Sequence, residues 1–270
     1  MGIESLKVGF IGAGNMGGAL AKAAAKTKCR QGLMLADKDV AKAESLAEAI
    51  GARTATGAEI AAECDFIFLG VKPQMMAGVL AEIKPALENR SGYTLVSMMA
   101  GVKTEKICAE LGFDAPVIRI MPNTAVEVGE GMVLYTVNAY ADEKAEKNFL
   151  AFMKKAGEFE KLPEHLIDAG TAVSGCGPAY VYMFIEALAD GGVKCGLPRA
   201  TAQKLAEQTL IGAAKLAKET GRHPEELKDA VCSPAGSTIA GCYALERGGF
   251  RASAISAVDA AYERTKELGK

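Results

Sequence analysis

The sequence is poor in the residues from which metal sites and disulfide frameworks are built. Its 270 residues include only two histidines, His165 and His223, which excludes a histidine-rich metal site. The seven cysteines are odd in number, and no pair has Cys-x-x-Cys spacing. This pattern argues against zinc and disulfides and favours a reducing compartment. We therefore expect no metal and a cytoplasmic location.

Long apolar runs and an excess of charge of one sign are also missing. No apolar run approaches the roughly 18 residues that a membrane span needs. Glu4 and the glycine pattern that follows argue against a signal peptide. The formal net charge is -2, with acidic and basic residues well mixed, so no basic field attracts a phosphate backbone. We expect neither a membrane nor a nucleic acid as partner.

Short apolar runs alternate with helical patterns in the first half of the chain. Five runs are rich in branched or aromatic residues, as in strands buried on both faces: residues 8–11, 33–35, 66–69, 94–97 and 117–120. Residues 131–137 are a candidate edge strand, and stretches such as 40–50 have the pattern of amphipathic helices. This alternation predicts an α/β fold with a Rossmann-type, doubly wound parallel sheet.

The second half has no such strand series. Helical periodicity covers residues 181–189, 200–219 and 253–268, and glycine pairs such as Gly191-Gly192 are expected to interrupt it. The turn-prone Leu162-Pro163-Glu164 marks the boundary. We expect a dinucleotide-binding domain over 1–162 and an all-helical domain over 163–270.

A glycine-rich loop, Gly12-Ala13-Gly14-Asn15-Met16-Gly17, follows the first expected strand and opens a helical stretch. This is the context that a dinucleotide fingerprint requires. Gly12 permits the tight turn, Gly14 lets a pyrophosphate approach the backbone, and Gly17 allows close helix packing. The helix N-terminus then attracts the anion. The alternative is a tight strand-to-helix turn without a ligand.

Asp37 stands at the end of the second expected strand, about 20 residues after Gly17. An acidic side chain there accepts hydrogen bonds from the adenosine ribose hydroxyls, which favours NAD over NADP. Lys38 stands beside it and could instead meet a 2′-phosphate. A solvated strand end is the alternative for both residues, and the sequence leaves the cofactor preference open.

Loops that follow strands line the ligand crevice of a doubly wound sheet. Val71-Lys72-Pro73 follows the third run, and residues 119–124, which include Asn123, continue the fifth. We expect both stretches at the cofactor. For Lys72 and Arg119, a surface charge or a structural ion pair is the alternative.

Two small-residue segments stand out in the helical half. Ser174-Gly175-Cys176-Gly177-Pro178-Ala179-Tyr180 opens it, and its glycines allow a close backbone approach. Ser233-Pro234-Ala235-Gly236-Ser237-Thr238 precedes a helix, where such residues form either a cap or an anion site. A small carboxylate would suit the second segment, and plain capping is the alternative.

Residues that could handle an alcohol proton are missing near these motifs. Neither His165 nor His223 lies close to one, and the helix after Gly177 begins without lysine. A site without a strong proton donor suits a substrate that already carries its proton, such as a cyclic iminium ion.

Together these stretches resemble the pyrroline-5-carboxylate reductase family over nearly the whole chain. They occur in family order and at family spacing, and Leu245-Glu246 follows the last of them. The pairing of Ser-Gly-x-Gly-Pro-Ala-Tyr with the later Ser-Pro-x-Gly-x-Thr is the specific part of the match.

The resemblance implies an NAD(P)H-dependent oxidoreductase acting on a CH–NH group. A hydride would pass to the C=N carbon of 1-pyrroline-5-carboxylate and give L-proline, the last step of proline biosynthesis. The helical half would be a dimerisation domain whose halves intertwine, so that the site uses two chains of a homodimer, which often assembles further.

The resemblance also implies residue roles. Thr238 would be catalytic, hydrogen-bonding the ring nitrogen. The substrate would be held by Ser174, Ser233, Gly236, Ser237 and Thr238. The cofactor would be held by Gly12, Gly14, Asn15, Met16, Gly17, Asp37, Lys38, Val71, Lys72, Pro73 and Asn123. Three positions depart from the family pattern: Ala125 replaces a frequent proline, Cys176 a serine and Ala235 a glycine.

Two other functions stay open. A related NAD(P)-dependent 3-hydroxyacid-type dehydrogenase would carry a lysine where this chain has Val181. A non-catalytic dinucleotide sensor would have no need of the segment from Ser233 to Thr238.

Overall fold

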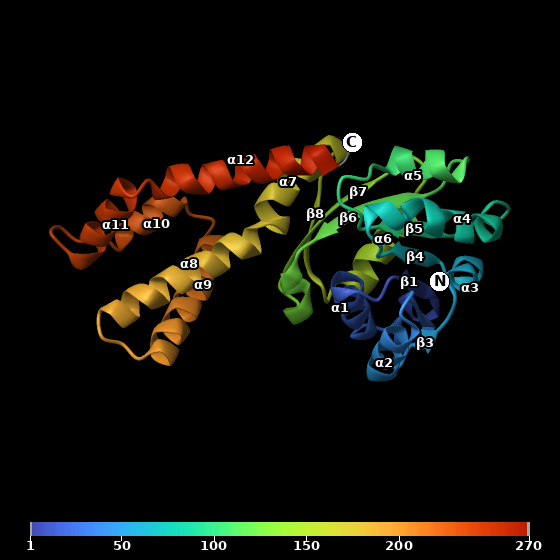
Figure 1. The fold of residues 1–270 in the computed structure, drawn as a ribbon, viewed down its shortest axis with the longest axis horizontal. Helices are drawn as coiled ribbons and strands as arrows, with labels where there is room; N and C mark the ends of the chain where they lie inside the picture. Colours follow the sequence, from blue (N-terminus) through green and yellow to red (C-terminus); the bar gives the residue numbers. More distant parts are fainter. Residues whose placement is uncertain (1, 269–270) are drawn as a thin grey trace. The chain divides into compact units, whose positions relative to one another are not determined.

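The computed structural model describes residues 2–268, which divide into two compact units. One unit holds the chain up to Cys176 and from Ala261 onward, and the other holds Gly177–Ala260. The first unit is built on an eight-stranded sheet in the order β3-β2-β1-β4-β5-β6-β7-β8 (Figure 1). Its strands are β1 Val8–Ile11, β2 Leu33–Ala36, β3 Arg53–Thr54, β4 Phe66–Leu69, β5 Thr94–Ser97, β6 Val117–Pro122, β7 Gly131–Val137 and β8 Gly157–Lys161.

The expected parallel sheet is confirmed from β3 to β6. All pairs in this part are parallel, whereas β7 runs antiparallel to β6 and β8 parallel to β7. The strand order reverses between β1 and its neighbours β2 and β4, which makes the carboxyl end of β1 the switch point at which such sheets bind ligands.

Helices cover both faces of the sheet because each presents one apolar side. One core lies beneath α1 Asn15–Ala25, α2 Val40–Ile50 and α6 Glu143–Met153. The other lies beneath α3 Gly57–Glu63, α4 Met76–Leu87 and α5 Thr104–Leu111. Phe10 and Phe68 stack in the first core with their ring centroids 4.3 Å apart. Strands between these layers are buried on both faces, which explains their continuous apolar runs.

Capping side chains fix where several helices begin. The Asp39 carboxylate accepts the Lys42 N–H at the start of α2. Thr56 and Glu59 form a reciprocal capping box at α3, with hydrogen bonds of 3.1 and 2.7 Å. Such caps satisfy N–H groups that have no acceptor within the helix.

Two strands were not expected from the sequence. β3 is only two residues long and exposed. β8 has the sequence Gly-Glu-Phe-Glu-Lys and is half exposed. Both lie at edges of the sheet, where charged side chains replace the apolar signal. Because β8 pairs with β7, the expected edge strand at Gly131–Val137 is second from the edge.

Beyond β8 the chain is helical, as expected. A short α7 Ile167–Gly170 leads into a π-helix over Thr171–Gly175. The second unit follows, with α8 Gly177–Lys194, α9 Arg199–Thr220, α10 Pro224–Ala230, α11 Ser237–Arg247 and the first part of α12 Phe250–Leu268.

The expected interruption at Gly191-Gly192 is wrong, because α8 continues to Lys194. A Cβ atom on Gly192 would lie 3.0 Å from Ala202 Cβ. The glycine therefore serves close packing of α9 on α8 (Figure 1).

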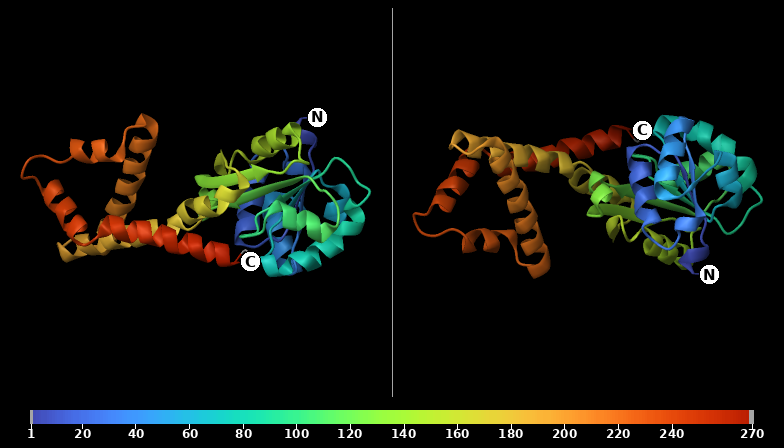
Figure 2. Two further views of the ribbon diagram at one scale, coloured as in Figure 1. Left: turned by 90° about the horizontal axis from the view of Figure 1, so that it is seen from above. Right: turned by 90° about the horizontal axis from the view of Figure 1, so that it is seen from below.

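The second unit has almost no core of its own. Among its described residues, only three apolar side chains are buried, and all are alanines: Ala189, Ala202 and Ala206. Its helices spread in an open frame rather than around a centre (Figure 2). Many larger apolar side chains are exposed, so this unit needs further contacts to bury them.

Within residues 2–268, one helical stretch, Glu164–Lys194, is long and apolar enough by length and composition to cross a membrane. The expectation that no stretch would be long enough is corrected to this extent. Asp168, near the start of this stretch, forms an ion pair with a buried arginine of the sheet. The start of the stretch is therefore packed as part of the α/β unit.

Candidate functional site

The glycine-rich loop lies at the switch point of the sheet. Gly12 has φ 108°, a conformation that side chains disfavour. Its N–H donates to Ala36 O at 2.7 Å. A Cβ on Gly12 would lie 2.4 Å from Gly70 O. Only glycine therefore permits the turn from β1 into α1.

The other two glycines match their expected roles in different ways. A Cβ on Gly17 would lie 2.1 Å from Gly12 O, so Gly17 lets the helix start close against the turn. A Cβ on Gly14 would meet nothing within 4 Å. Gly14 is the N-cap of α1 and makes no side-chain cap, so its open side and the first-turn N–H groups fit a pyrophosphate. Asn15 and Met16 form the first turn of this helix.

Asp37 ties the glycine loop to the turn after β2. One carboxylate oxygen accepts the Ala13 N–H at 2.7 Å, and the other accepts the Asp39 N–H at 2.9 Å. Both oxygens are thus engaged by backbone donors. Lys38 is exposed and has no ion-pair partner in the described part of the chain. Asp37 therefore has less capacity to accept hydrogen bonds from ribose hydroxyls, whereas the Lys38 ammonium is available to a ligand.

The loop after β4 contributes a glycine that sequence reasoning missed. Gly70 donates its N–H to Ile11 O at 2.8 Å and packs against Gly12. Its position directly after an apolar strand was the available signal. Val71 packs against the core, Lys72 is exposed, and Pro73 begins a 3-10 helix, Pro73–Met75.

Asn123, directly after β6, uses its whole amide within the fold. Its Oδ1 accepts the N–H groups of Ala125 at 3.2 Å and Met132 at 3.3 Å. Its Nδ2 donates to Ser174 O at 3.0 Å. The structure therefore brings together two predicted site residues, Asn123 and Ser174, which are 51 positions apart in the chain.

Arg119 is fully buried on β6, at 0% exposure. Its Nη2 donates to Asp168 Oδ1 at 2.7 Å, and its Nη1 lies 3.6 Å from Glu164 Oε1. Of the two alternatives for Arg119, the structural ion pair is therefore the one observed. Asp168 and Glu164 lie far from Arg119 in the sequence; Glu164 was marked only as part of the boundary turn and Asp168 belonged to no motif, so the sequence did not indicate this ion pair.

In the second unit, residues from Ser233 to Thr238 form a tight turn before α11. Gly236 N–H donates to Ser233 O at 3.0 Å, and Gly236 is the N-cap of the helix. No side chain caps α11, so the plain capping alternative is not observed. Ser237 and Thr238 begin the helix with first-turn N–H groups that have no helical acceptor. This arrangement suits a small anion.

Ala235 gives this turn its shape. Its φ is 56°, the one positive value among the described non-glycine residues, and the left-handed region disfavours a Cβ. Gly236 is equally required for this shape, since a Cβ there would lie 2.4 Å from Ser233 Oγ.

A cavity of about 460 Å³ lies between α10 and α11. Its lining includes Ala235 and Gly236 but not the hydroxyl-bearing residues of the turn.

Other reactive side chains have ordinary structural roles. His223 caps α10 by accepting the Glu225 N–H at 3.2 Å. Burial and a hydrogen bond with Cys242 raise the pKa of the Cys232 thiol, so it is neutral at physiological pH. Across residues 2–268, no three His, Cys, Asp or Glu side chains are placed to hold a metal.

Comparison with known proteins decides the family. The model for pyrroline-5-carboxylate reductase dimerisation matches residues 164–268, and one for NADP oxidoreductase coenzyme F420-dependent proteins matches residues 7–101. The pyrroline-5-carboxylate reductase of Synechocystis sp. is 43% identical over 98% of this chain and 99% of its own. The chain belongs to the pyrroline-5-carboxylate reductase family.

Two solved members of the family have the same fold. The Plasmodium falciparum pyrroline carboxylate reductase, solved with NADP bound, is 34% identical with a TM-score of 0.88 and covers 100% of both chains. The Coxiella burnetii pyrroline-5-carboxylate reductase is 31% identical with a TM-score of 0.90 and covers 98% of this chain and 99% of its own. The recognised family, the α/β fold and an NAD(P)H-dependent oxidoreductase are thereby confirmed.

Membership in this family also confirms the expected type of assembly. The match to the dimerisation model spans the helical half, which is the part whose apolar side chains lack a core. The protein is a homo-oligomer that acts on a small molecule.

Proposed function

We propose that this protein reduces 1-pyrroline-5-carboxylate to L-proline in the cytoplasm, as the last step of proline biosynthesis. One observation carries this proposal: the chain is related to these reductases over nearly its full length and contains both the glycine loop and the uncapped turn before α11. The bound cofactor, NAD(P)H, supplies the hydride for the C=N carbon.

The glycine loop holds the pyrophosphate in this proposal. Gly12, Gly14 and Gly17 give backbone access and helix N–H groups, and Asn15 and Met16 flank the same turn. Val71, Lys72, Pro73 and Asn123 line the neighbouring strand ends.

Lys38 is the residue that we expect to set the cofactor preference, in favour of NADPH. Both oxygens of Asp37 already accept backbone N–H groups, which leaves them less capacity for ribose hydroxyls. Lys38 is exposed and unpaired within the described residues, so it is available to a 2′-phosphate. Lys38→Gln should lower the ratio of kcat/KM for NADPH over NADH by about tenfold. Lys26→Gln, at an exposed lysine at the C-terminal end of α1, is the control and should leave the ratio unchanged.

The turn before α11 binds the substrate in this proposal. The carboxylate accepts first-turn N–H groups and the hydroxyls of Ser233, Ser237 and Thr238, while Gly236 keeps the turn open for Ser233. Thr238 Oγ1 acts as the catalytic contact to the ring nitrogen, and Ser174 provides a further substrate contact. Catalysis then depends on positioning and electrostatics rather than on a strong acid.

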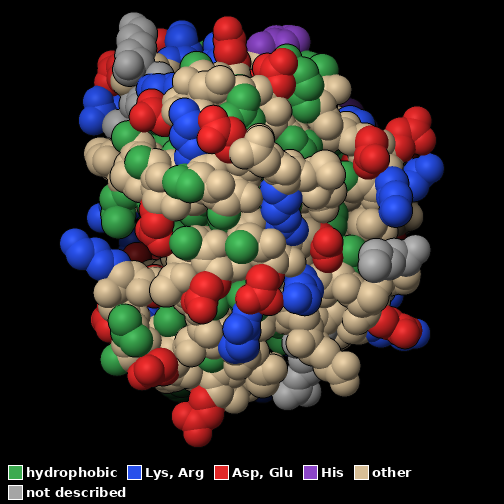
Figure 3. All heavy atoms as spheres, turned by 90° about the vertical axis from the view of Figure 1, so that its right-hand side faces the viewer, with side chains coloured by type: hydrophobic (Ala, Val, Ile, Leu, Met, Phe, Trp, Pro, Cys, Tyr) green, Lys and Arg blue, Asp and Glu red, His purple; other side chains and the backbone are tan. Residues whose placement is uncertain are grey.

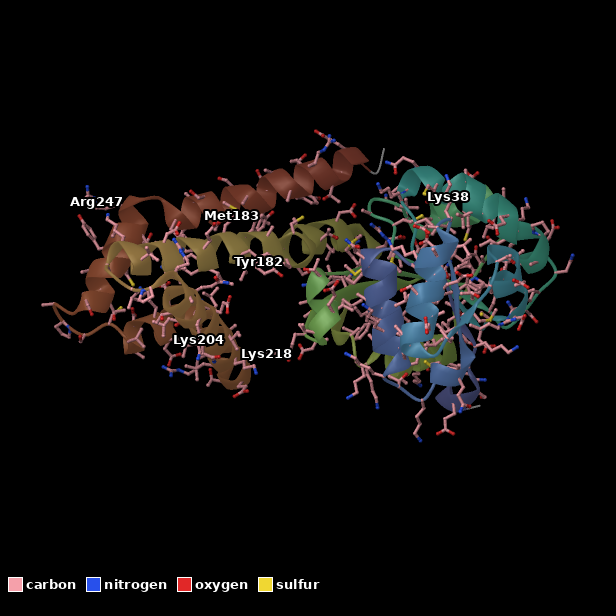
Figure 4. All side chains as sticks on the ribbon, turned by 60° about the horizontal axis from the view of Figure 1, so that its bottom comes forward. Lys38, Tyr182, Met183, Lys204, Lys218 and Arg247 are labelled. Atoms are coloured by element: carbon pink, nitrogen blue, oxygen red, sulfur yellow. The ribbon has the colours of Figure 1, made fainter. Side chains whose placement is uncertain are left out.

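We further propose that the oligomer is a homodimer that can assemble further. Tyr182 and Met183 on α8 are 61% and 70% exposed (Figure 4), and a second chain would bury such side chains. Neither a membrane nor a nucleic acid is needed as a partner. Acidic and basic side chains are interspersed on the face drawn in Figure 3.

The direct test follows the absorbance of reduced cofactor when pyrroline-5-carboxylate is added, in parallel with NADH and NADPH. Consumption accompanied by proline supports the proposal, with the faster rate expected for NADPH. Protein that binds cofactor but consumes none would refute it and favour the sensor alternative. Oxidation of a 3-hydroxy acid with NAD(P) would favour the dehydrogenase alternative.

A further inference from the structure

The segment between β8 and α8 contains a π-helix, Thr171–Gly175, which closes with a hydrogen bond from Cys176 N–H to Thr171 O at 3.0 Å. A π-helix corresponds to one residue inserted into an α-helix. Such insertions are rare in proteins as a whole, but those that occur often lie at functional sites. Its effect is to turn the following residues about the helix axis. Ser174 lies within this π-helix, and its carbonyl accepts a hydrogen bond from Asn123.

The segment is held to β6 at two points. Arg119 Nη2 binds Asp168 Oδ1 at 2.7 Å just before the π-helix. Asn123 Nδ2 binds Ser174 O at 3.0 Å inside it. Because Asn123 Oδ1 accepts two backbone N–H groups, the amide can direct only its NH₂ group at Ser174. Arg119 on β6 and Asn123 directly after it thus hold the segment at two points, Asp168 and Ser174.

The same network reaches a third element. Glu164, which lies 3.6 Å from Arg119 Nη1, also accepts the Thr104 N–H at 2.8 Å and the Thr104 hydroxyl at 3.0 Å. Thr104 is the first residue of α5. The start of the segment is therefore fixed against the helix layer as well as against the sheet.

Stability alone does not explain a guanidinium in this place. Arg119 is fully buried, and its Nε and Nη1 have no hydrogen-bond partner in the described part of the protein. A buried ion pair with unsatisfied donors is commonly no more stable than well-packed apolar side chains of similar volume. What the charge does provide is a directional contact to Asp168, and hence one defined position for the helix that carries Ser174.

We propose that Arg119 is a positioning residue for catalysis, which together with Asn123 holds the π-helix so that Ser174 and its neighbours meet the reactants in one fixed place. This inference rests on the proposed function. Arg119 itself touches neither substrate nor cofactor, because its side chain is fully enclosed. Its contribution is transmitted through Asp168 and the π-helix.

Arg119→Met tests this role, since methionine keeps an apolar stem of similar length in the buried site. Asp168 is partly exposed and can be hydrated in the variant. We expect one cofactor bound per chain with a Kd within about threefold of the unaltered protein, because the glycine loop lies on other strands. We expect kcat to fall by about tenfold or more, because small misplacements of reacting groups slow the chemical step strongly.

The deuterium isotope effect with C4-deuterated cofactor separates this role from a structural one. Misplacement makes hydride transfer more rate-limiting, so the isotope effect on kcat rises in Arg119→Met. A merely structural role would reduce the fraction of protein that binds cofactor, with turnover per bound cofactor and isotope effect unchanged. Asp168→Asn removes the charge that Nη2 contacts, so we expect kcat and the isotope effect to change in the same direction as in Arg119→Met. Lys147→Gln, at an exposed position of α6, is the control, with kcat within about threefold.

Deletion of Val173 provides a second test should Arg119→Met fail to fold. Val173 is 61% exposed, and removing one residue converts the π-helix to an α-helix without removing a core side chain. Loss of turnover with cofactor binding retained supports the proposal. Turnover per bound cofactor equal to that of the unaltered protein, in either variant, overturns it. Absence of pyrroline-5-carboxylate reduction by the unaltered protein would instead overturn the proposed function.

Discussion

The geometry of the glycine loop makes Gly17→Ala a sharp test of the dinucleotide site. An alanine Cβ would lie 2.1 Å from Gly12 O. The turn and the helix start must separate by about 1 Å before this contact becomes ordinary. That movement carries the first-turn N–H groups away from the pyrophosphate. Loss of one hydrogen bond to the charged pyrophosphate costs about 1.5–3 kcal/mol of binding free energy, which corresponds to a rise in Kd of about ten- to 100-fold.

The adjacent Gly18 supplies the matched control. A Cβ there would lie 3.4 Å from Leu46 Cδ2 and 3.5 Å from Ala13 O, which are nearly ordinary contacts. Gly18→Ala should leave the Kd for NADPH within about threefold, and helix propensity should raise the free energy of unfolding by about 0.5–1 kcal/mol. Titration of reduced-cofactor fluorescence measures both Kd values. An unchanged Kd in Gly17→Ala, or equal losses in both variants, would refute the reasoning.

Three further predictions address the substrate turn, the assembly and the core. Thr238→Ala should lower kcat by about tenfold or more while the Kd for cofactor stays within about twofold, as one transition-state hydrogen bond is lost; unchanged turnover in steady-state assays would remove Thr238 from catalysis. Met183→Glu should shift the assembly toward monomer in analytical ultracentrifugation, whereas Lys204→Glu on the exposed side of α9 should not; equal profiles would place the interface elsewhere. Burial raises the pKa of the Cys64 thiol from about 9 to about 12, so the unfolded chain releases this proton first and stability falls as pH rises above about 9. Thermal melts of Cys64→Ala should show a shallower decline in that range, and identical slopes would contradict the assignment.

The first half of the fold followed from the sequence because buried parallel strands leave a strong local signal. The runs at Phe66–Leu69 and Thr94–Ser97 are strands with the expected bounds. β8 has no such apolar signal, because its charged residues are those of an exposed edge strand. It is recognisable as a strand only through its pairing with β7. The prediction of a helix break at Gly192 was wrong because this glycine allows close packing against Ala202 of α9. The local sequence does not reveal that neighbour.

The candidate site could be predicted from the sequence where all the residues in contact with one another belong to one short motif. Gly12, Gly14 and Gly17 lie within six residues, so their roles could be derived from spacing. Arg119 could not be assigned in this way, because its partner Asp168 is 49 positions away and belongs to an unmarked stretch. The engagement of Asp37 by the glycine loop likewise depends on the tertiary fold, so the sequence left the cofactor preference open.

The proposed function depends on hydride transfer to the C=N carbon of 1-pyrroline-5-carboxylate. The most direct measurement supplies the protein with this substrate and with cofactor that carries deuterium at the transferred C4 position, and then analyses the product by mass spectrometry. We expect L-proline that has gained one deuterium, formed in step with cofactor oxidation. Proline without deuterium, or cofactor bound without any proline formed, would contradict it.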